Sequence, residues 1–175
     1  MTLIKYRDEF IDLLNTLDKV CIEHVINLIS VRKTYPFFVI GNGGSASNAS
    51  HFAQDLLNTV KINAISLCND ISTITAIAND ISYEDIFSEQ LERMGKKWGV
   101  LVAISGSGNS KNIIKAVNTA NKIGMTMLGF TGFDGGELAK LIDYSIIVPS
   151  NDMRMIESTH SFVLHYIVNE LVHET

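Results

Sequence analysis

The chain has 175 residues, of which 46% are hydrophobic and 19% are charged. That length suits one domain, and that composition supplies a buried core and excludes a disordered or low-complexity chain. The formal net charge of −5 argues against binding of nucleic acid, which depends on neutralising phosphates with Lys and Arg. A small anionic ligand stays compatible with this charge, because such a ligand responds to a local field.

Cysteine usage and the N-terminal residues indicate a cytoplasmic protein. Cys21 and Cys68 are too far apart in the chain to suggest a metal motif, and two cysteines make no disulfide framework. Charges interrupt the first nine residues, so we expect no secretory leader. The longest uncharged window, 34–54, changes from apolar residues to Gly, Ser and Asn, so we expect no membrane span.

The apolar pattern predicts a helical arm and then alternating strands and helices. The arm is 1–33, with apolar residues at three- and four-residue steps over 4–30, and it packs on the domain or on another copy. Five short apolar runs are typical of buried parallel strands: 37–40, 62–67, 100–104, 125–130 and 144–148. Helices are expected at 45–58, 71–94, 110–124, 136–142 and 153–173. This alternation predicts a single α/β domain over 1–175, with its core at 34–175.

Two loops rich in Gly and Ser, 41–47 and 105–110, each follow a predicted strand and precede a helix. Ligands of α/β sheets bind at this edge, where free N–H groups of a helix start point to an anion. Gly lets the backbone approach the ligand, and Ser hydroxyls donate to phosphate or sugar oxygens. The loops therefore indicate a phosphate site, without the Gly-Lys-Ser/Thr of a nucleotide P-loop. For either loop alone, turns and N-caps are the alternative.

A dinucleotide site is a second interpretation of the first loop. Gly41, Gly43 and Ala46 fit the loose dinucleotide fingerprint, and Asp70 lies just past the second predicted strand. The serines of both loops favour a phosphate over a dinucleotide, so we expect no nucleotide cofactor.

Several motifs in a consistent order over residues 37–170 resemble the sugar isomerase (SIS) domain family, and within it the phosphoheptose isomerases. They are GNGGSA at 41–46, HFA at 51–53, TAIAND at 75–80, ISGSGNS at 104–110, TGFDGG at 131–136, VPS at 148–150 and the segment 157–165. The resemblance implies a doubly wound, five-stranded parallel sheet of flavodoxin-like order. It also implies a homotetramer that the N-terminal arm helps to build, with active sites at subunit interfaces. The implied reaction converts sedoheptulose 7-phosphate to D-glycero-D-manno-heptose 7-phosphate for lipopolysaccharide or capsule synthesis.

The resemblance assigns the chemistry to a helix carboxylate and a C-terminal histidine. Aldose–ketose isomerisation moves a proton between adjacent carbons through an enediol, and it needs a base and an acid. By the resemblance Asp55 is the base, four residues after His51 on one helix face, and His165 is its acid–base partner. The family usually has Glu at the position of Asp55. The shorter side chain would set the carboxylate about 1 Å back, a displacement that can cost about 100-fold in rate.

A zinc site is a further implication of the resemblance. Some members bind zinc through the helix His, the carboxylate, a Gln and the C-terminal His. Here the set is His51, Asp55, Glu157 and His165, with Glu157 at the usual Gln position. Two imidazoles and two carboxylates are suitable ligands for zinc. The alternative is that Glu157 is a helix-surface carboxylate or a ligand of a sugar hydroxyl.

The resemblance also implies the residues that bind substrate. They are Asn42, Gly43, Ser45, Asn79, Asp80, Ser105, Ser107, Ser110 and Glu157. The serines surround the phosphate, Asn79 and Asp80 lie near the sugar chain, and Asn42 meets a hydroxyl or a carbonyl. For Asp80 a helix cap or a turn acid is the alternative. Related isomerases carry a phosphate-binding Arg in a longer segment after the His helix, where this chain offers only Lys61.

Two functions stay open on the sequence alone. One is the isomerase; the other is a non-catalytic SIS-domain protein that binds a phosphosugar or associates with a replication initiator, as some relatives do. Those relatives lack the acid after the His helix. The presence of Asp55 and His165 therefore favours the enzyme.

Overall fold

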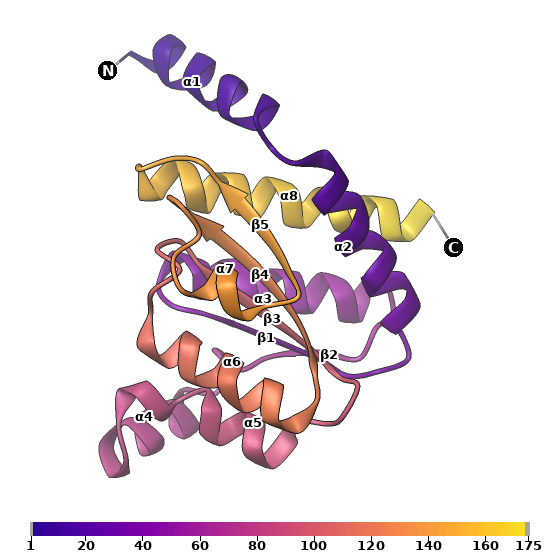
Figure 1. The fold of residues 1–175 in the computed structure, drawn as a ribbon, viewed down its shortest axis with the longest axis vertical. Helices are drawn as coiled ribbons and strands as arrows, with labels where there is room; N and C mark the ends of the chain where they lie inside the picture. The colour runs from indigo at the N-terminus through magenta and orange to yellow at the C-terminus, as the bar shows by residue number, and fades with distance from the viewer. Residues whose placement is uncertain (1, 174–175) are drawn as a thin grey trace.

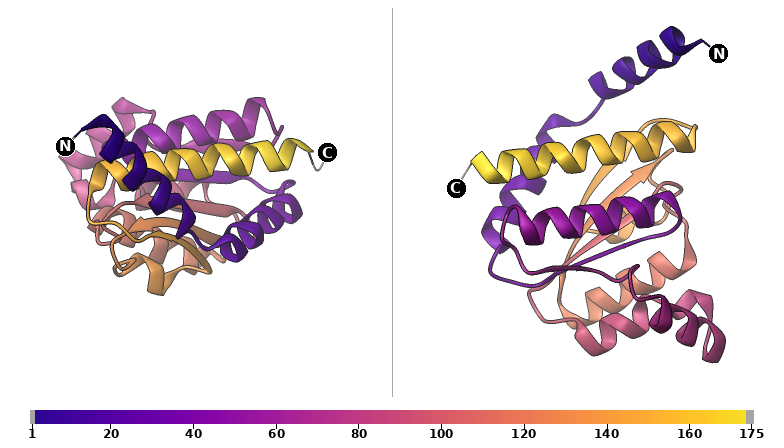
Figure 2. Two further views of the ribbon diagram at one scale, coloured as in Figure 1. Left: turned by 90° about the horizontal axis from the view of Figure 1, so that it is seen from above. Right: turned by 180° about the vertical axis from the view of Figure 1, so that it is seen from behind.

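A computed structural model describes residues 2–173 as a parallel sheet between two layers of helices (Figure 1 and Figure 2). Residues 1, 174 and 175, which the predicted domain includes, lie outside the described residues. The five strands follow the order β2-β1-β3-β4-β5, and every neighbouring pair is parallel. This is the flavodoxin-like order, so the predicted fold class is confirmed.

The central strands are buried along their whole length because helices cover both faces of the sheet. The strands are β1 (Phe37–Gly41), β2 (Ala64–Ser66), β3 (Val100–Ser105), β4 (Thr126–Gly132) and β5 (Tyr144–Val148). Every residue of β1 and β3 is buried, which explains why both read as continuous apolar runs. The edge strands β2 and β5 expose Ile65 and Ile147.

The helices divide between the two faces of the sheet. One face carries α2 (Lys19–Arg32), α3 (Gly44–Asn58) and α8 (Met153–His173). The other carries α4 (Ile71–Asp80), η1 (Tyr83–Asp85), α5 (Ser88–Met94), α6 (Lys111–Ile123) and α7 (Leu138–Leu141). Both α3 and α8 start at the carboxyl edge of the sheet and run side by side (Figure 1, Figure 2). Among residues 2–173 no helix has the length and apolar character needed to cross a membrane.

The N-terminal arm is two helices, whereas the apolar pattern ran unbroken over 4–30. The first, α1 (Leu3–Asn15), buries no residue and projects away from the sheet (Figure 1). The Asp18 carboxylate accepts a hydrogen bond from the backbone N–H of Cys21 and so begins α2. The Asp18 carboxylate satisfies a backbone N–H that a helix start leaves without an intrahelical partner, so it stabilises a new helix start at this point.

The predicted helix 71–94 is interrupted, and it forms α4, η1 and α5 instead. The Ser82 hydroxyl accepts from the backbone N–H of Glu84, which starts the short turn η1. Serine competes for backbone donors in this way and disfavours a helix interior. The interruption brings Tyr83 to the loop that follows β1.

A buried histidine, His160, joins α8 to the sheet. Its Nε2 donates to the backbone carbonyl of Thr131 on β4 at 2.9 Å, and among the described residues its Nδ1 has no partner. The side chain is fully buried, and this burial lowers its pKa to about 4 from an ordinary value of 6.5. The imidazole is therefore neutral in the folded protein near pH 7.

We predict that the protein loses stability between pH 7.5 and pH 5 through His160. The lowered pKa means that the unfolded chain binds a proton that the folded chain does not, so the stabilisation is complete above pH 6.5 and falls as pH drops. The free energy of unfolding should drop by about 2 kcal/mol at pH 5 from this group. Urea unfolding of wild type and His160→Gln, at one protein concentration, measures it. The variant should lack this part of the pH dependence; identical slopes would contradict the prediction.

Candidate active site

The two Gly- and Ser-rich loops meet in one pocket at the carboxyl edge of β1 and β3. The pocket is lined by Asn42, Ser45, Ile104, Ser105, Gly106, Ser107, Ser110, Met153 and Glu157. Helices α3 and α6 begin here, and their N-cap residues, Gly43 and Ser110, make no side-chain cap hydrogen bond. Serine hydroxyls and free backbone donors therefore converge on this pocket, which suits an anion such as a phosphate.

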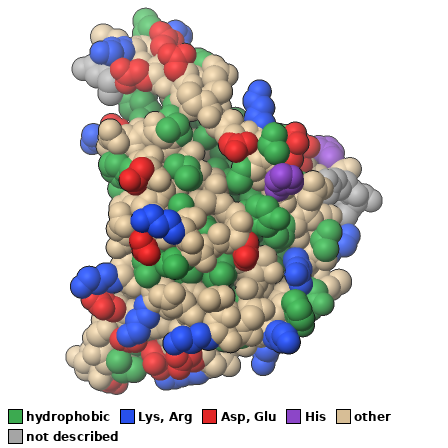
Figure 3. Space-filling view, viewed as in Figure 1, with side chains coloured by type: hydrophobic (Ala, Val, Ile, Leu, Met, Phe, Trp, Pro, Cys, Tyr) green, Lys and Arg blue, Asp and Glu red, His purple; other side chains and the backbone are tan. Residues whose placement is uncertain are grey.

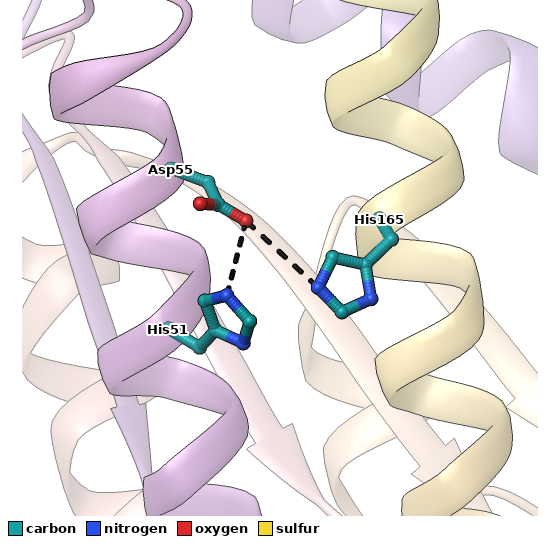
Figure 4. A group of neighbouring side chains, drawn as sticks. All are labelled: His51, Asp55 and His165. Atoms are coloured by element: carbon teal, nitrogen blue, oxygen red, sulfur yellow. Dashed lines mark ion pairs between the residues drawn. The ribbon is translucent and has the colours of Figure 1, made fainter.

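A second group of side chains lies on α3 and α8, further from the carboxyl edge of the sheet. His51 and Asp55 come from α3 and His165 comes from α8, and all three face the groove between the helices (Figure 4). The Oδ2 atom of Asp55 lies 3.6 Å from Nε2 of His51 and 4.0 Å from Nε2 of His165. The two imidazole rings meet edge to face, with centroids 4.8 Å apart. The Asp55 side chain is only 17% exposed, whereas both imidazoles are about half exposed.

This arrangement depends on helix geometry and on one cross-helix contact. The i, i+4 spacing puts His51 and Asp55 on one face of α3, and that face packs against α8. The Asn48 side-chain amide donates to the backbone carbonyl of Glu157 at 3.0 Å and joins the two helices between the pocket and the group. Sequence reasoning missed Asn48, because nothing local signals a bond to a carbonyl so distant in the chain.

Glu157 is separate from His51, Asp55 and His165. The ligand atoms of those three residues all lie within 4.8 Å of one another, and Glu157 does not belong to that group. Its carboxylate instead lies against Gly44, where a Cβ would overlap it, and it lines the serine pocket. The structure thus brings together three of the four ligands expected for a metal and places the fourth at the serine pocket.

Three more residues of interest lie outside the pocket lining. Asn79 and Asp80 end α4, are exposed, and bond to each other at 2.8 Å. Lys61 donates from Nζ to the carbonyl of Asn58 at the C-terminal end of α3. Because α3 has 15 residues, this end lies about 20 Å from the pocket, so Lys61 does not supply a cation to the pocket of its own chain.

Two residues that the sequence reasoning did not single out contact the pocket residue Asn42. They are Tyr83, from η1, and the buried Asn112, from the first turn of α6. Asn112 lies outside both loops and outside every motif quoted from the sequence, so no sequence signal marked it.

Comparisons with known proteins show the family to which this chain is similar. The sequence profile of the SIS domain matches residues 5–132. A phosphoheptose isomerase of Helicobacter pylori (strain P12) is 46% identical over 134 residues, covering 74% of this chain and 70% of its own. One of Shewanella denitrificans is 48% identical over 139 residues, covering 75% and 71%.

Solved structures extend the likeness over nearly the whole chain. A phosphoheptose isomerase from Neisseria gonorrhoeae superposes with a TM-score of 0.91 at 30% identity, covering 97% of this chain and 96% of its own. One from Francisella tularensis gives 0.88 at 28% identity, covering 99% and 100%.

We predict that Gly108→Ala destabilises the second loop far more than Gly43→Ala destabilises the first. Both glycines have positive φ, so either substitution strains the backbone by about 1–3 kcal/mol. A Cβ at residue 108 would also overlap the carbonyl of Gly135, whereas a Cβ at residue 43 meets open space. Urea unfolding compares the two variants with wild type. Equal losses of stability would contradict the packing described here.

Proposed function

The chain belongs to the SIS domain family and, within it, to the phosphoheptose isomerases, and on that premise we propose how its residues perform the reaction. It is a phosphosugar isomerase that converts sedoheptulose 7-phosphate to a heptose 7-phosphate for heptose synthesis. The observation that carries the proposed roles is the convergence of Asp55 and His165. They come from α3 and α8, the two helices whose first turns also line the serine pocket.

We propose Asp55 as the base that moves the carbon-bound proton. The carboxylate would take a proton from C1 of the ketose and return it to C2, passing through an enediol. His165 would donate a proton to the oxygen on C2 and accept one from the oxygen on C1. Its half-exposed imidazole is open to a ligand, and its Nε2 lies 4.0 Å from the carboxylate, so one substrate could contact both.

The phosphate end of the substrate belongs, in this proposal, in the serine pocket. The phosphate would accept hydrogen bonds from the hydroxyls of Ser45, Ser105, Ser107 and Ser110. It would also accept from the backbone N–H groups at the starts of α3 and α6. On α8, Glu157 lines the serine pocket, and His165 belongs to the group that it forms with His51 and Asp55. These two residues of α8 are eight positions apart, or about 12 Å along the helix axis. The phosphate and the reacting carbons of a seven-carbon sugar lie at opposite ends of the molecule. The separation of the two pockets therefore supports an extended substrate that reaches from one to the other.

We propose the same pocket as the place where the sugar hydroxyls near the phosphate are held. Glu157 supplies a carboxylate that can accept from them, and Asn42 and Gly43 form the loop beside it. We propose that Asn79 and Asp80 bind the sugar chain. For this contact, either α4 moves toward the pocket or another subunit completes the groove. Both are exposed in the single chain.

A divalent metal fits the group formed by His51, Asp55 and His165. Two imidazole nitrogens and one carboxylate oxygen within 4.8 Å match a catalytic zinc site, which uses three protein ligands and leaves one position open. We propose that these three residues hold zinc, in a state of the site in which the atoms that ligate the metal do not transfer the protons assigned to them above. When bound, the metal would supply Lewis-acid polarisation of a substrate oxygen. Glu157 would serve the substrate, since its carboxylate lies at the other pocket.

We also propose a homotetramer in which residues 1–33 form the arm that joins subunits of a single SIS domain over 1–175. In support, α1 buries no residue within its own chain and exposes Leu3, Ile4 and Ile11. On α8, Phe162 and Tyr166 are exposed beside an apolar hollow that α2 also lines. Figure 3 shows apolar side chains spread over the face below α1, while charged side chains gather over the end formed by α4, α5 and α6.

The setting that we propose is the cytoplasm, with the heptose product supplying lipopolysaccharide or capsule synthesis. The family implies this setting, and the sugar phosphate is a small water-soluble molecule. Relatives named as phosphoheptose isomerases in Helicobacter pylori and Shewanella denitrificans support the assignment to heptose supply.

We predict that the purified protein turns over sedoheptulose 7-phosphate and that Asp55→Asn and His165→Asn each lower kcat by about 100- to 10,000-fold. Losses of that size are typical when a general acid or base is removed. His173→Asn, which changes an exposed histidine at the end of the same helix, is the matched control and should keep wild-type activity. Binding of the sugar phosphate without turnover by wild type would instead favour a non-catalytic binding protein.

We predict one zinc ion bound per chain when chelator-treated protein is titrated at pH 7.5. Removing one imidazole ligand, in His51→Ala, should weaken zinc binding at least tenfold, because a catalytic site has only three protein ligands. His24→Ala removes a histidine on α2, away from this group, and serves as control. Calorimetry reports the affinity independently of activity. Equal zinc affinity in wild type and His51→Ala would contradict the assigned ligands.

A further inference from the structure

The side chain of Asn42 is held by two residues to which the proposed mechanism gives no role. Its Nδ2 donates to Oδ1 of Asn112, and Nδ2 of Asn112 donates back to Oδ1 of Asn42, each at 2.9 Å. The phenol of Tyr83 donates to the same Oδ1 of Asn42 at 3.1 Å. Three segments distant in the sequence thus meet on one amide: the loop after β1, the turn η1 and the start of α6.

A backbone donor determines which way both amides face. The N–H of Ile113 donates to Oδ1 of Asn112 at 3.0 Å, and a backbone N–H can only donate. The oxygen of Asn112 is thereby identified, so the nitrogen of Asn42 must face it and the oxygen of Asn42 must face the nitrogen of Asn112. Asn112 is only 3% exposed, so water competes little for these bonds.

These bonds leave Asn42 with a single unused hydrogen-bonding group. A side-chain amide has two donor hydrogens and an oxygen with two acceptor positions. Asn112 and Tyr83 occupy both acceptor positions, and Asn112 takes one hydrogen. Among residues 2–173 no partner takes the second hydrogen, and Asn42 lines the serine pocket. Asn42 can therefore only donate to a ligand in that pocket.

We propose that Asn112 and Tyr83 are positioning residues that hold the Asn42 amide in one orientation, so that it donates its free Nδ2 hydrogen to an oxygen of the substrate. This inference rests on the proposed function of the pocket. It specifies the chemistry of the contact: the partner is an oxygen that accepts, such as a carbonyl or phosphate oxygen. A hydroxyl that needs an acceptor for its own hydrogen finds none on Asn42. A fixed donor of this kind stabilises negative charge on the oxygen that it contacts without reorganising.

Tyr83→Phe tests the proposal with little risk to folding, because the ring is exposed and only the hydroxyl is removed. Loss of one hydrogen bond to Asn42 should lower kcat/KM for sedoheptulose 7-phosphate about three- to tenfold. Tyr35→Phe removes the same group from a tyrosine before β1, at the opposite edge of the sheet, and should leave kcat/KM unchanged. Asn112→Asp, nearly equal in size, puts an oxygen against Oδ1 of Asn42 and should lower kcat/KM at least tenfold.

A double-mutant cycle separates positioning from a general structural effect. If Tyr83 acts through the Asn42 amide, Tyr83→Phe should change kcat/KM less than twofold in an Asn42→Ala background. The same fold-loss in both backgrounds would overturn the proposal, and so would a Tyr83→Phe variant with wild-type kcat/KM.

Calorimetric binding of sedoheptulose 7-phosphate distinguishes failure of this proposal from failure of the proposed function. A wild type that binds without turnover contradicts the isomerase alone, and the cycle is then read from dissociation constants. Coupled losses of affinity would support the positioning role, and additive losses would overturn it. A wild type that binds no sedoheptulose 7-phosphate at all would overturn both.

Discussion

The packing of α3 against α8 is the constraint on which the whole site depends. Both helices cover one face of the sheet and start at its carboxyl edge, so their side chains face each other in matching order along the groove. Near their starts the groove carries Ser45 and Glu157, and further along it carries Asp55 and His165. The end proposed to bind the phosphate and the end proposed to carry the chemistry are therefore held in line by the same pair of helices.

Parallel strand order supplies the second constraint. In a parallel sheet all carboxyl ends meet at one edge, so the loops after β1 and β3 become neighbours although residues 48–104 separate them in the chain. Their closeness allows Asn42 and Asn112 to pair, and it lets two helix starts point at one pocket. The donors of the pocket are thus consequences of topology together with local Gly and Ser content.

Residue patterns predicted most of the fold and much of the site, and they were weakest where capping competes with periodicity. Strands β1 and β3 were predicted from continuous apolar runs, because helices cover both faces of the sheet at these strands. The breaks at Asp18 and Ser82 were missed, because each depends on one side chain accepting from a backbone N–H. The pairing of His51 with Asp55 followed from helical spacing, whereas the separate location of Glu157 did not.

The sequence by itself determined the chemistry that is present: two donor-rich loops after strands, a carboxylate and an imidazole one helical turn apart, and a second imidazole near the end of the chain. Tertiary structure alone decided which groups meet. The approach of His165 to Asp55 depends on how α8 crosses the sheet, and the orientation of the Asn42 amide depends on residues 41 and 70 positions away. Local propensity acts over a few residues, and long-range packing sets the distances that the chemistry needs.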